Sequence, residues 1–488
     1  MPKTKSEKPS KNVDTNVTRT SGNHSEISKE PNWKPVNDSL GPTPMNVILY
    51  GIDSVSRLSL RRYMPDVFAT LQKHDAIDLK GYNKVGLNTY PNLMPILTGR
   101  PGKDIRDAIK DRHKAHDNVP FIWKNFSSNN YITMYAEDTP DISSFNYKKL
   151  GFVKQPTDFY LRPVFMAAQK HIAYGPYSNR YFCFRDKNVA QLMVEYLIDY
   201  AKSFWHQPWF GMFWTNALTH DDLQYGTTSE DALKNLIKSY DERSEFNNSI
   251  LIFFSDHGLR FGSFRQKTHM GKYEDSLPFN FIMVPKWFQK VYPEAYKNLK
   301  TNEQRLTTPY DVYATLIDIL TGRLENRKKS KVETIGTSLF DEIREDRTCD
   351  MAKIPAEFCV GDVFLKFDKE KTIFKDLMSF VLKSINKEMR KFNGCVQFTD
   401  YSLIKVMKVI KRTRFPKKED DIKTDKKGDF LVKFQLAPGE GVFEATVSVI
   451  NNKFKILGEI SRLNRYGNQS HCISDSYYSR ICFCEHQL

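Results

Sequence analysis

Asp256 and His257 are two adjacent residues whose side chains can bind one metal ion. They follow a run of apolar residues and precede Gly258, which allows the chain to turn sharply enough for both side chains to converge. A carboxylate with an imidazole suits zinc or manganese better than magnesium or calcium, although calcium stays an alternative. The pair therefore predicts a divalent metal site. The other interpretation is a loop with a buried Asp–His hydrogen bond.

Asp53 and Thr89 are the candidates to complete this metal site. Asp53 directly follows the apolar run 46–52, where it can be a metal ligand or the N-cap of a following helix. Thr89 stands at the expected N-cap of another helix, with Pro91 in its first turn. Backbone N–H groups at such a helix start form an anion site. A metal-bound hydroxyl there is deprotonated and can attack phosphorus, whereas the alternative role of Thr89 is only a cap.

The elements that must position these residues are predicted to form a mostly parallel sheet covered by helices on both faces. Continuous apolar runs that suit buried strands alternate with segments whose apolar residues have helical spacing. We expect strands at 46–52, 131–136, 209–214, 250–255 and 279–284, and helices at 58–73, 188–204, 229–245 and 309–320. In such α/β folds the active site lies beyond the carboxyl ends of the strands. Asp53 and Asp256 each directly follow a predicted strand.

The sequence divides into three predicted parts: a disordered leader at 1–44, a catalytic domain at 45–343 and a C-terminal α+β region at 344–488. The third part is expected to contain a helix at 364–390 and a hairpin that turns at Asn451-Asn452. Six of the seven cysteines lie there and predict disulfides of undetermined connectivity, at Cys349, Cys359, Cys395, Cys472, Cys482 and Cys484. Free buried thiols are the simpler alternative.

The net charge of +15 does not by itself predict a nucleic-acid partner, because part of it lies in the polar leader and another part in 404–429, a predicted solvated loop. No apolar run approaches the roughly 20 residues that span a bilayer. The sequence as written starts without a signal peptide. The C-terminal cysteines and six N-x-[ST] sequons favour a secretory or extracellular location.

The order of these elements, Asp53, then Thr89, then Asp256-His257-Gly258, resembles the alkaline phosphatase/sulfatase superfamily. The residues around these motifs most resemble a family of animal sulfatase-like proteins that carry a domain of unknown function. The stretches that match are 46–57, 88–100, 215–222 and 255–278, together with the C-terminal cysteine pattern. The resemblance covers about residues 45–484 and implies an alkaline phosphatase-like fold.

The resemblance also implies roles for individual residues. Asp53, Asp256 and His257 correspond to metal ligands, and Thr89 to the nucleophile and fourth ligand. His220 corresponds to a histidine that binds a substrate oxygen, protonates a leaving group or binds a second metal.

A second metal site stays in doubt at this stage. In two-metal relatives an Asp occupies the position of Asn216, and an uncharged amide is a weaker ligand. His269 can complete such a site, while Lys272 competes with it as a substrate-binding residue. Three arginines are candidate anion clamps, although a structural role is simpler for each: Arg57, Arg100 and Arg265.

The predicted reaction follows from the residue that stands at the nucleophile position. Sulfatases of this superfamily require Cys or Ser in the frame C/S-x-P-x-R, whereas this chain has Thr89, Pro91 and Leu93 in that register. Threonine is not a precursor of formylglycine, so we expect hydrolysis or transfer of phosphate monoesters or diesters. The substrate is expected to be an anionic small molecule or a glycan or lipid ester. The alternative is a catalytically inactive, secreted sulfatase-like glycoprotein that acts as a binding module.

Overall fold

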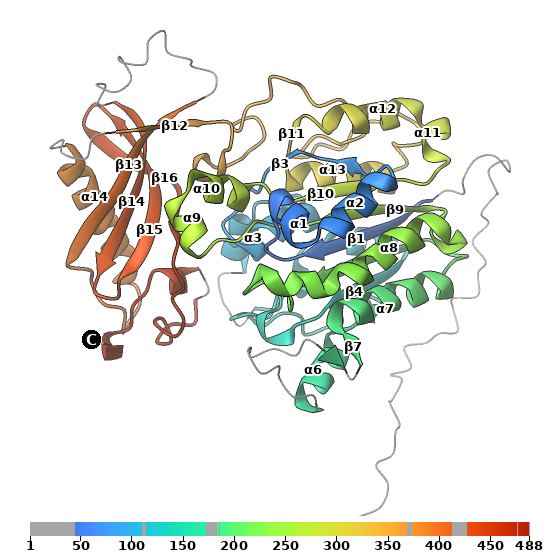
Figure 1. Cartoon of the computed structure of the whole chain (residues 1–488), viewed down its shortest axis with the longest axis horizontal. Coiled ribbons are helices and arrows are strands. Elements are labelled where there is room, and N and C mark those ends of the chain that lie inside the picture. Colours follow the sequence, from blue (N-terminus) through green and yellow to red (C-terminus); the bar gives the residue numbers. More distant parts are fainter. Residues whose placement is uncertain are drawn as a thin grey trace, which may run out of the picture.

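The molecule consists of a large α/β body and a smaller antiparallel sheet that lies beside it (Figure 1). The computed structural model describes residues 44–109, 114–171, 183–184, 186–367, 373–411, 427–475 and 477–487. The predicted leader lies outside the described residues except for Pro44, and so does most of the predicted basic loop.

The central sheet of the body has the strand order β2-β10-β9-β1-β8-β4-β5. Five of these strands run parallel, namely β9 (Ser249–Phe254), β1 (Asn46–Ile52), β8 (Trp209–Thr215), β4 (Ile132–Glu137) and β5 (Phe159–Tyr160). At the other edge, β10 (Asn280–Met283) is antiparallel to both β9 and β2 (Ile77–Asp78). The predicted mostly parallel sheet is therefore confirmed.

Helices cover both faces of this sheet, which explains why every residue of β1, β8 and β9 is buried. Val47 and Leu49 of β1 face one core and Ile48 and Tyr50 face the other. The first core includes α3 (Thr89–Thr98), α5 (Ile122–Ser128) and α13 (Pro309–Leu320). The second includes α1 (Arg57–Tyr63), α2 (Pro65–Lys73), α7 (Val189–Ser203) and α8 (Glu230–Glu242).

Two helix predictions had different outcomes. The helix at 309–320 is confirmed, with Thr308 and Asp311 forming a capping box before Pro309 in the first turn. The single helix predicted at 58–73 is wrong, because the chain forms α1 and α2 separately. Pro65 begins α2, and its missing N–H cannot continue the hydrogen bonding of α1.

Short elements complete the body. They are β3 (Gly81–Tyr82), α4 (Gly102–Ala108), α6 (Arg162–His171), β6 (Cys183–Phe184), β7 (Lys187–Asn188), α9 (Ser263–Lys267), α10 (His269–Ser276), α11 (Phe288–Val291), α12 (Pro293–Asn302) and β11 (Leu306–Thr307). Of these, α9 and α10 lie next to the C-terminal sheet (Figure 1).

The C-terminal region is an antiparallel sheet packed against one long helix, α14 (Ile373–Met389). Its five strands are, in order, β12 (Val363–Lys366), β13 (Asp400–Ile410), β14 (Gly428–Ala437), β15 (Gly441–Ile450) and β16 (Lys453–Arg462). The predicted hairpin is confirmed, since Asn451 and Asn452 connect β15 and β16 with φ values of 51° and 59°. The helix predicted at 364–390 is wrong at its start, because β12 pairs with β13 there.

Six cysteines form three disulfides, which fits an oxidising, secretory or extracellular environment. The pairs are Cys349–Cys359, Cys395–Cys482 and Cys472–Cys484. None of the helices in the described ranges combines the length and apolar character needed to cross a bilayer.

Candidate metal centre

Asp53, Asp256 and His257 meet at the carboxyl ends of two neighbouring parallel strands. Asp53 directly follows β1, and Asp256 follows β9 after a single serine. One ligand atom from each of the three side chains lies within 4.8 Å of the others. All three residues are buried. The topology of the sheet therefore brings together three of the predicted ligands, although about two hundred residues separate the first from the other two.

The imidazole of His257 is oriented by its own turn. Its Nδ1 lies 2.8 Å from the carbonyl oxygen of Gly258, which can only accept a hydrogen bond. Nδ1 therefore carries the proton of the neutral ring, and Nε2 has a lone pair.

Nε2 of His257 lies 3.2 Å from Oδ2 of Asp256 and 3.9 Å from Oδ1 of Asp53. Among the described residues, Nε2 and Oδ2 of Asp256 are buried and have no hydrogen-bond partner. Two ligands of a tetrahedral zinc, each about 2.1 Å from the metal, lie roughly 3.4 Å apart. The spacing and the two lone pairs therefore fit a shared cation.

Burial shifts the pKa values in this group in opposite directions. The pKa of Asp256 is raised well above its usual value by burial and by the nearby charge of Asp53. The pKa of His257 is lowered well below its usual value by burial, with further contributions from Arg260 and Lys84. A neutral imidazole is the form that binds a metal, and a divalent cation would offset the cost of burying the carboxylates.

Backbone groups and hydroxyls hold the carboxylates in place. Oδ1 of Asp256 accepts hydrogen bonds from the backbone N–H groups of Ser54, at 3.1 Å, and His257, at 2.9 Å. The Ser54 hydroxyl donates to Asp53 at 2.7 Å. Ser54 has a φ of 66°, a left-handed conformation that costs energy for a residue other than glycine and is found disproportionately at functional sites. Asp53 is not the predicted helix cap, because Ser56 caps α1.

Thr89 is the first residue of α3, and Asn88 occupies the N-cap position that was predicted for Thr89. The difference of one residue matters because the Thr89 hydroxyl does not cap the helix. It is directed instead at Asp256, where hydrogen bonding lowers the pKa of that carboxyl. Asn92 fixes the preceding loop, since its Oδ1 accepts from the N–H groups of Val85 and Gly86, both at 2.8 Å.

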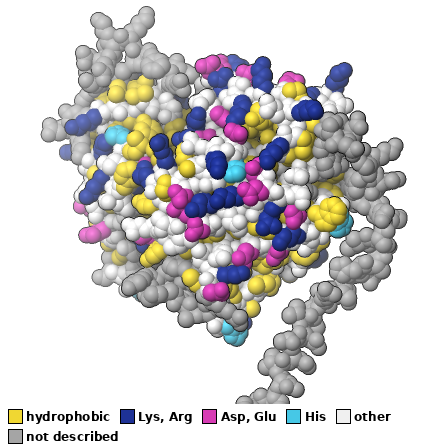
Figure 2. Space-filling model, turned by 45° about the vertical axis from the view of Figure 1, so that its right-hand side comes forward, with side chains coloured by type: hydrophobic (Ala, Val, Ile, Leu, Met, Phe, Trp, Pro, Cys, Tyr) yellow, Lys and Arg dark blue, Asp and Glu magenta, His cyan; other side chains and the backbone are white. Residues whose placement is uncertain are grey.

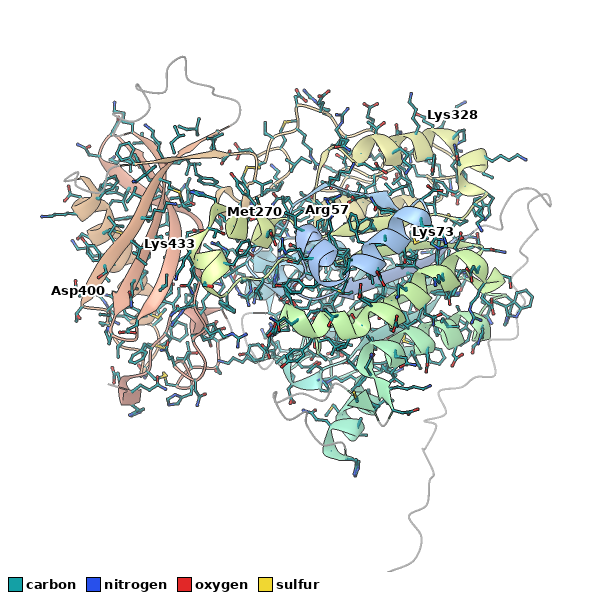
Figure 3. The ribbon with its side chains drawn as sticks, in the orientation of Figure 1. Arg57, Lys73, Met270, Lys328, Asp400 and Lys433 are labelled. Carbon is teal, nitrogen blue, oxygen red and sulfur yellow. A yellow bond between two sulfur atoms is a disulfide. The ribbon has the colours of Figure 1, made fainter. Side chains whose placement is uncertain are left out.

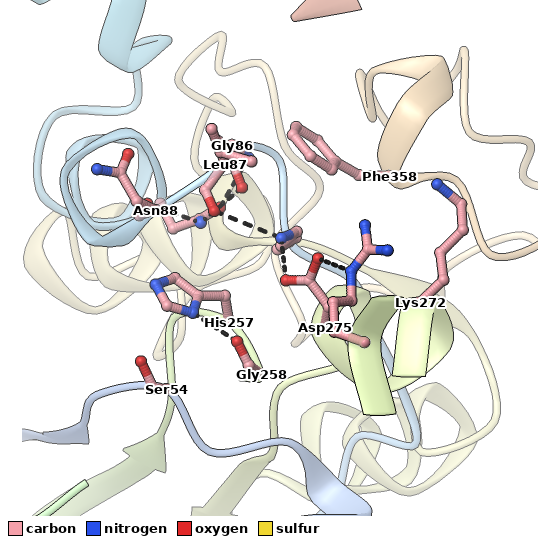
Figure 4. A network of polar contacts seen from close by, with 12 residues as sticks. Ser54, Gly86, Leu87, Asn88, His257, Gly258, Lys272, Asp275 and Phe358 are labelled. Carbon is pink, nitrogen blue, oxygen red and sulfur yellow. Dashed lines mark hydrogen bonds and ion pairs between the residues drawn. The ribbon is translucent and has the colours of Figure 1, made fainter. Parts of the chain in front are cut away.

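Lys84 is a buried cation beneath this loop that the sequence analysis did not identify. Its Nζ donates to Asp275 and lies 3.5 Å from the carbonyl oxygen of Leu87. Figure 4 labels these two partners, Asp275 and Leu87. Burial lowers the pKa of Lys84 to about 8, even though Asp275 favours the charged form. Lys84 therefore connects the loop that precedes Thr89 to helix α10.

The residues predicted for a second metal site or for substrate binding do not converge as Asp53, Asp256 and His257 do. Asn216 is buried after β8, where its Nδ2 donates to Glu137 at 3.3 Å. His220 is partly exposed, and its Nδ1 lies 3.0 Å from Asp221. Its charge still contributes to the low pKa of His257, so it lies within electrostatic reach of the metal centre.

His269 and Lys272 lie on α10, where their contacts are with the C-terminal region. Nε2 of His269 is 3.0 Å from Nζ of Lys405, and Lys272 forms an ion pair with Glu444 at 2.9 Å. In the described part of the chain, Asp53, Asp256 and His257 form the single cluster of three or more His, Asp and Glu ligands.

Of the three candidate anion clamps, Arg57 is paired with Asp78 and Arg265 is buried against Asp275. Arg100 is exposed beyond the C-terminal end of α3, at the opposite end of that helix from Thr89, so it is not part of the site. Arg260, for which the sequence pattern predicts no role, lies only three residues after His257. Its position next to the Asp-His-Gly motif was the one available signal.

The comparison with known families now identifies the chain. A family model described as "Protein of unknown function (DUF229)" matches residues 6–404. The chain belongs to the DUF229 family. This membership confirms the resemblance to a family that carries a domain of unknown function.

Solved structures similar to this DUF229 protein have low sequence identity. A protein in the alkaline phosphatase superfamily from Vibrio parahaemolyticus is 10% identical, with 85% of this chain and 82% of that chain covered and a TM-score of 0.45. The phosphonate monoester hydrolase from Silicibacter pomeroyi is 12% identical, with 83% and 89% covered and a TM-score of 0.45. The lipoteichoic acid synthase from Listeria monocytogenes is 12% identical, with 63% and 78% covered and a TM-score of 0.41. Likeness at this level carries no information about activity. No curated protein matches the chain.

Proposed function

We propose that this DUF229 protein is a metal-dependent hydrolase or transferase of phosphate monoesters or diesters, with Thr89 as its nucleophile. The observation that carries the proposal is the approach of Nε2 of His257 to Oδ2 of Asp256, at 3.2 Å, because both atoms are buried and have no hydrogen-bond partner among the described residues. Zinc or manganese suits this donor set, with calcium as the alternative, because an imidazole ligand disfavours hard cations. Asp53 and Thr89 would complete the ligand set.

Each residue of the proposed site has its own role in the reaction. When bound, the cation supplies positive charge that lowers the pKa of the Thr89 hydroxyl and balances charge on the phosphoryl oxygens. The oxygen of Thr89 forms a bond to phosphorus while the bond to the leaving group breaks. The backbone N–H groups of Thr89 and Tyr90, at the start of α3, are proposed to hold nonbridging oxygens, whereas Pro91 has no N–H to donate. His220, oriented by Asp221 through Nδ1, is the candidate that protonates the leaving oxygen.

Threonine at position 89 and leucine at position 93 support phosphoryl rather than sulfuryl transfer. The substrate is proposed to be an anionic small molecule or a glycan or lipid ester, met in the secretory pathway or outside the cell. Nucleic acid is not the proposed partner. On the face shown in Figure 2, Lys and Arg side chains are mixed with Asp and Glu side chains.

The test combines metal analysis with turnover. The purified protein is expected to contain about one zinc or manganese per chain and to hydrolyse 4-nitrophenyl phosphate or its bis-ester. Thr89→Ala should abolish turnover and leave most of the metal bound, because three ligands stay in place. Bound metal without turnover of either ester would contradict the proposal and support a binding module instead.

A further inference from the structure

We propose that the C-terminal region completes the substrate site, where Arg260 and Arg465 bind a second anionic group of the substrate. The inference rests on the proposed function and narrows its substrate class to esters with a further phosphate, sulfate or carboxylate group near the ester that reacts. The reacting group would occupy the metal centre and the start of α3, and the second group would lie toward the C-terminal region.

Arg260 is half-buried, and no counterion for it lies among the residues that the structure describes. In the described part of the chain it forms no ion pair and no hydrogen bond; its guanidinium lies 4.7 Å from the ring centre of Phe261. Arg57 and Arg265, in contrast, are each paired with a carboxylate. A guanidinium that is held in place and not neutralised is a suitable group for binding an anion.

The segment that follows β16 contacts the loops that carry His220 and Arg260. Arg465 donates to the carbonyl oxygen of Asp221, whose carboxylate lies 3.0 Å from Nδ1 of His220. The next residue, Tyr466, has its ring centre 6.4 Å from that of Phe261. The C-terminal region therefore contacts both the loop that carries His220 and the loop that carries Arg260.

A network of buried ion pairs fixes the C-terminal sheet against the body. Nε of Arg265 lies 2.8 Å from Asp275, and its Nη2 lies 3.1 Å from Glu444 of β15. Lys272 reaches the same Glu444 oxygen at 2.9 Å. Nearby, Lys433 of β14 donates to the carbonyl oxygen of Gln266 (Figure 3).

All members of this network of ion pairs between Arg265 and Glu444 are buried. A buried ion that loses its partner is strongly destabilising. The C-terminal sheet is therefore not free to slide along α9 and α10. Arg465, which follows β16 closely, is therefore held in place against the loop that carries His220. This is the condition for a subsite that distinguishes between substrates rather than a general basic surface.

The experiment compares two substrates that differ by one anionic group, glucose 1-phosphate and glucose 1,6-bisphosphate. The wild type should favour the bisphosphate in kcat/KM by roughly tenfold or more, mainly through KM. R260Q and R465Q should each reduce this preference by several fold. Because Arg465 is exposed, R465Q tests the subsite without removing a buried side chain.

R100Q is the matched control, because Arg100 is an exposed arginine beyond the far end of α3. It removes the same charge and should leave the preference unchanged. Equal kcat/KM values for both substrates in the wild type would overturn the inference and leave the proposed function standing. So would a preference that R260Q and R465Q do not reduce.

Failure of the proposed function gives a different result. If neither ester is turned over, binding of glucose 1,6-bisphosphate to the zinc-loaded protein is measured by calorimetry. Weaker binding in R260Q and R465Q, but not in R100Q, would support the subsite in a protein without catalytic activity. Binding that is absent or equal in all variants would overturn it.

Discussion

Nε2 of His257 faces Oδ2 of Asp256 at 3.2 Å, and the Gly258 carbonyl accepts the only proton of the neutral imidazole. Two buried ligand atoms without a hydrogen-bond partner among the described residues therefore lie side by side inside the protein. A bound cation would contact both of them. Occupancy of the metal centre should therefore be linked to the stability of the fold.

Zinc or manganese is expected to raise the melting temperature of the wild type and to have little effect on H257A. A ligand that binds only the folded state at 100 times its Kd stabilises it by about 2.7 kcal/mol. The measurement is thermal unfolding after chelation, with increasing metal. H269A is the control, because the exposed His269 contacts Lys405 instead. Loss of the metal effect in H269A but not in H257A would contradict the assignment of the site.

Lys84→Met is expected to reduce both stability and kcat. The substitution leaves Asp275 with one cationic partner fewer and releases the loop before Thr89. Removing one partner of a buried pair costs about 3 kcal/mol or more. Urea unfolding and steady-state kinetics measure the two effects, and kcat should fall by a larger factor than KM changes.

Lys234→Met provides the matched control for Lys84→Met. Lys234 also forms ion pairs, with Asp66 and Asp231, but these pairs lie at the surface. We expect no measurable change in stability or kcat. If Lys84→Met had as little effect, Lys84 would not position the loop.

The strands and the clustering of Asp53, Asp256 and His257 could be predicted from the sequence because the signals are local. A continuous apolar run marks a strand buried on both faces, and a polar residue directly after it marks the functional edge of the sheet. Asp53 and Asp256 satisfy both conditions. Proximity in the fold then follows from parallel pairing of β1 with β9.

Lys84 could not be predicted in this way, because its partner Asp275 is 191 residues away. A lone lysine in a loop is normally solvated, and only the packing of α10 against the loop buries this one. The β12 strand was missed for a related reason. Its four residues become a strand by pairing with β13, about forty residues later.

Glu137→Gln is expected to reduce the loss of stability that accompanies a rise in pH. Burial raises the pKa of Glu137 to about 7, compared with 4.5 for an exposed glutamate. Between these values the folded chain binds more protons than the unfolded chain, so wild-type stability falls as pH rises. Titration of Glu137 is expected to lower the free energy of unfolding by roughly 3 kcal/mol by pH 8.

Urea unfolding at pH 5 and pH 8 measures the difference between the wild type and E137Q. E242Q changes an exposed glutamate at the end of α8 and should behave like the wild type. Parallel pH dependence in the wild type and E137Q would show that Glu137 does not titrate in this range.

The disulfides are expected to contribute unequally to stability. Cys395–Cys482 closes a loop of 87 residues, whereas Cys349–Cys359 closes one of 10. In the chain-entropy model these loops correspond to about 4.6 and about 2.7 kcal/mol of stabilisation. The paired variants C395S/C482S and C349S/C359S, compared by urea unfolding, should therefore differ by about 2 kcal/mol.

The longer bridge also joins the end of the chain to the segment after α14, so its loss should loosen the segment that carries Arg465. We expect C395S/C482S to show a reduced preference for the bisphosphate and an unchanged metal content. An unchanged preference would show that the buried charges alone hold the sheet in place.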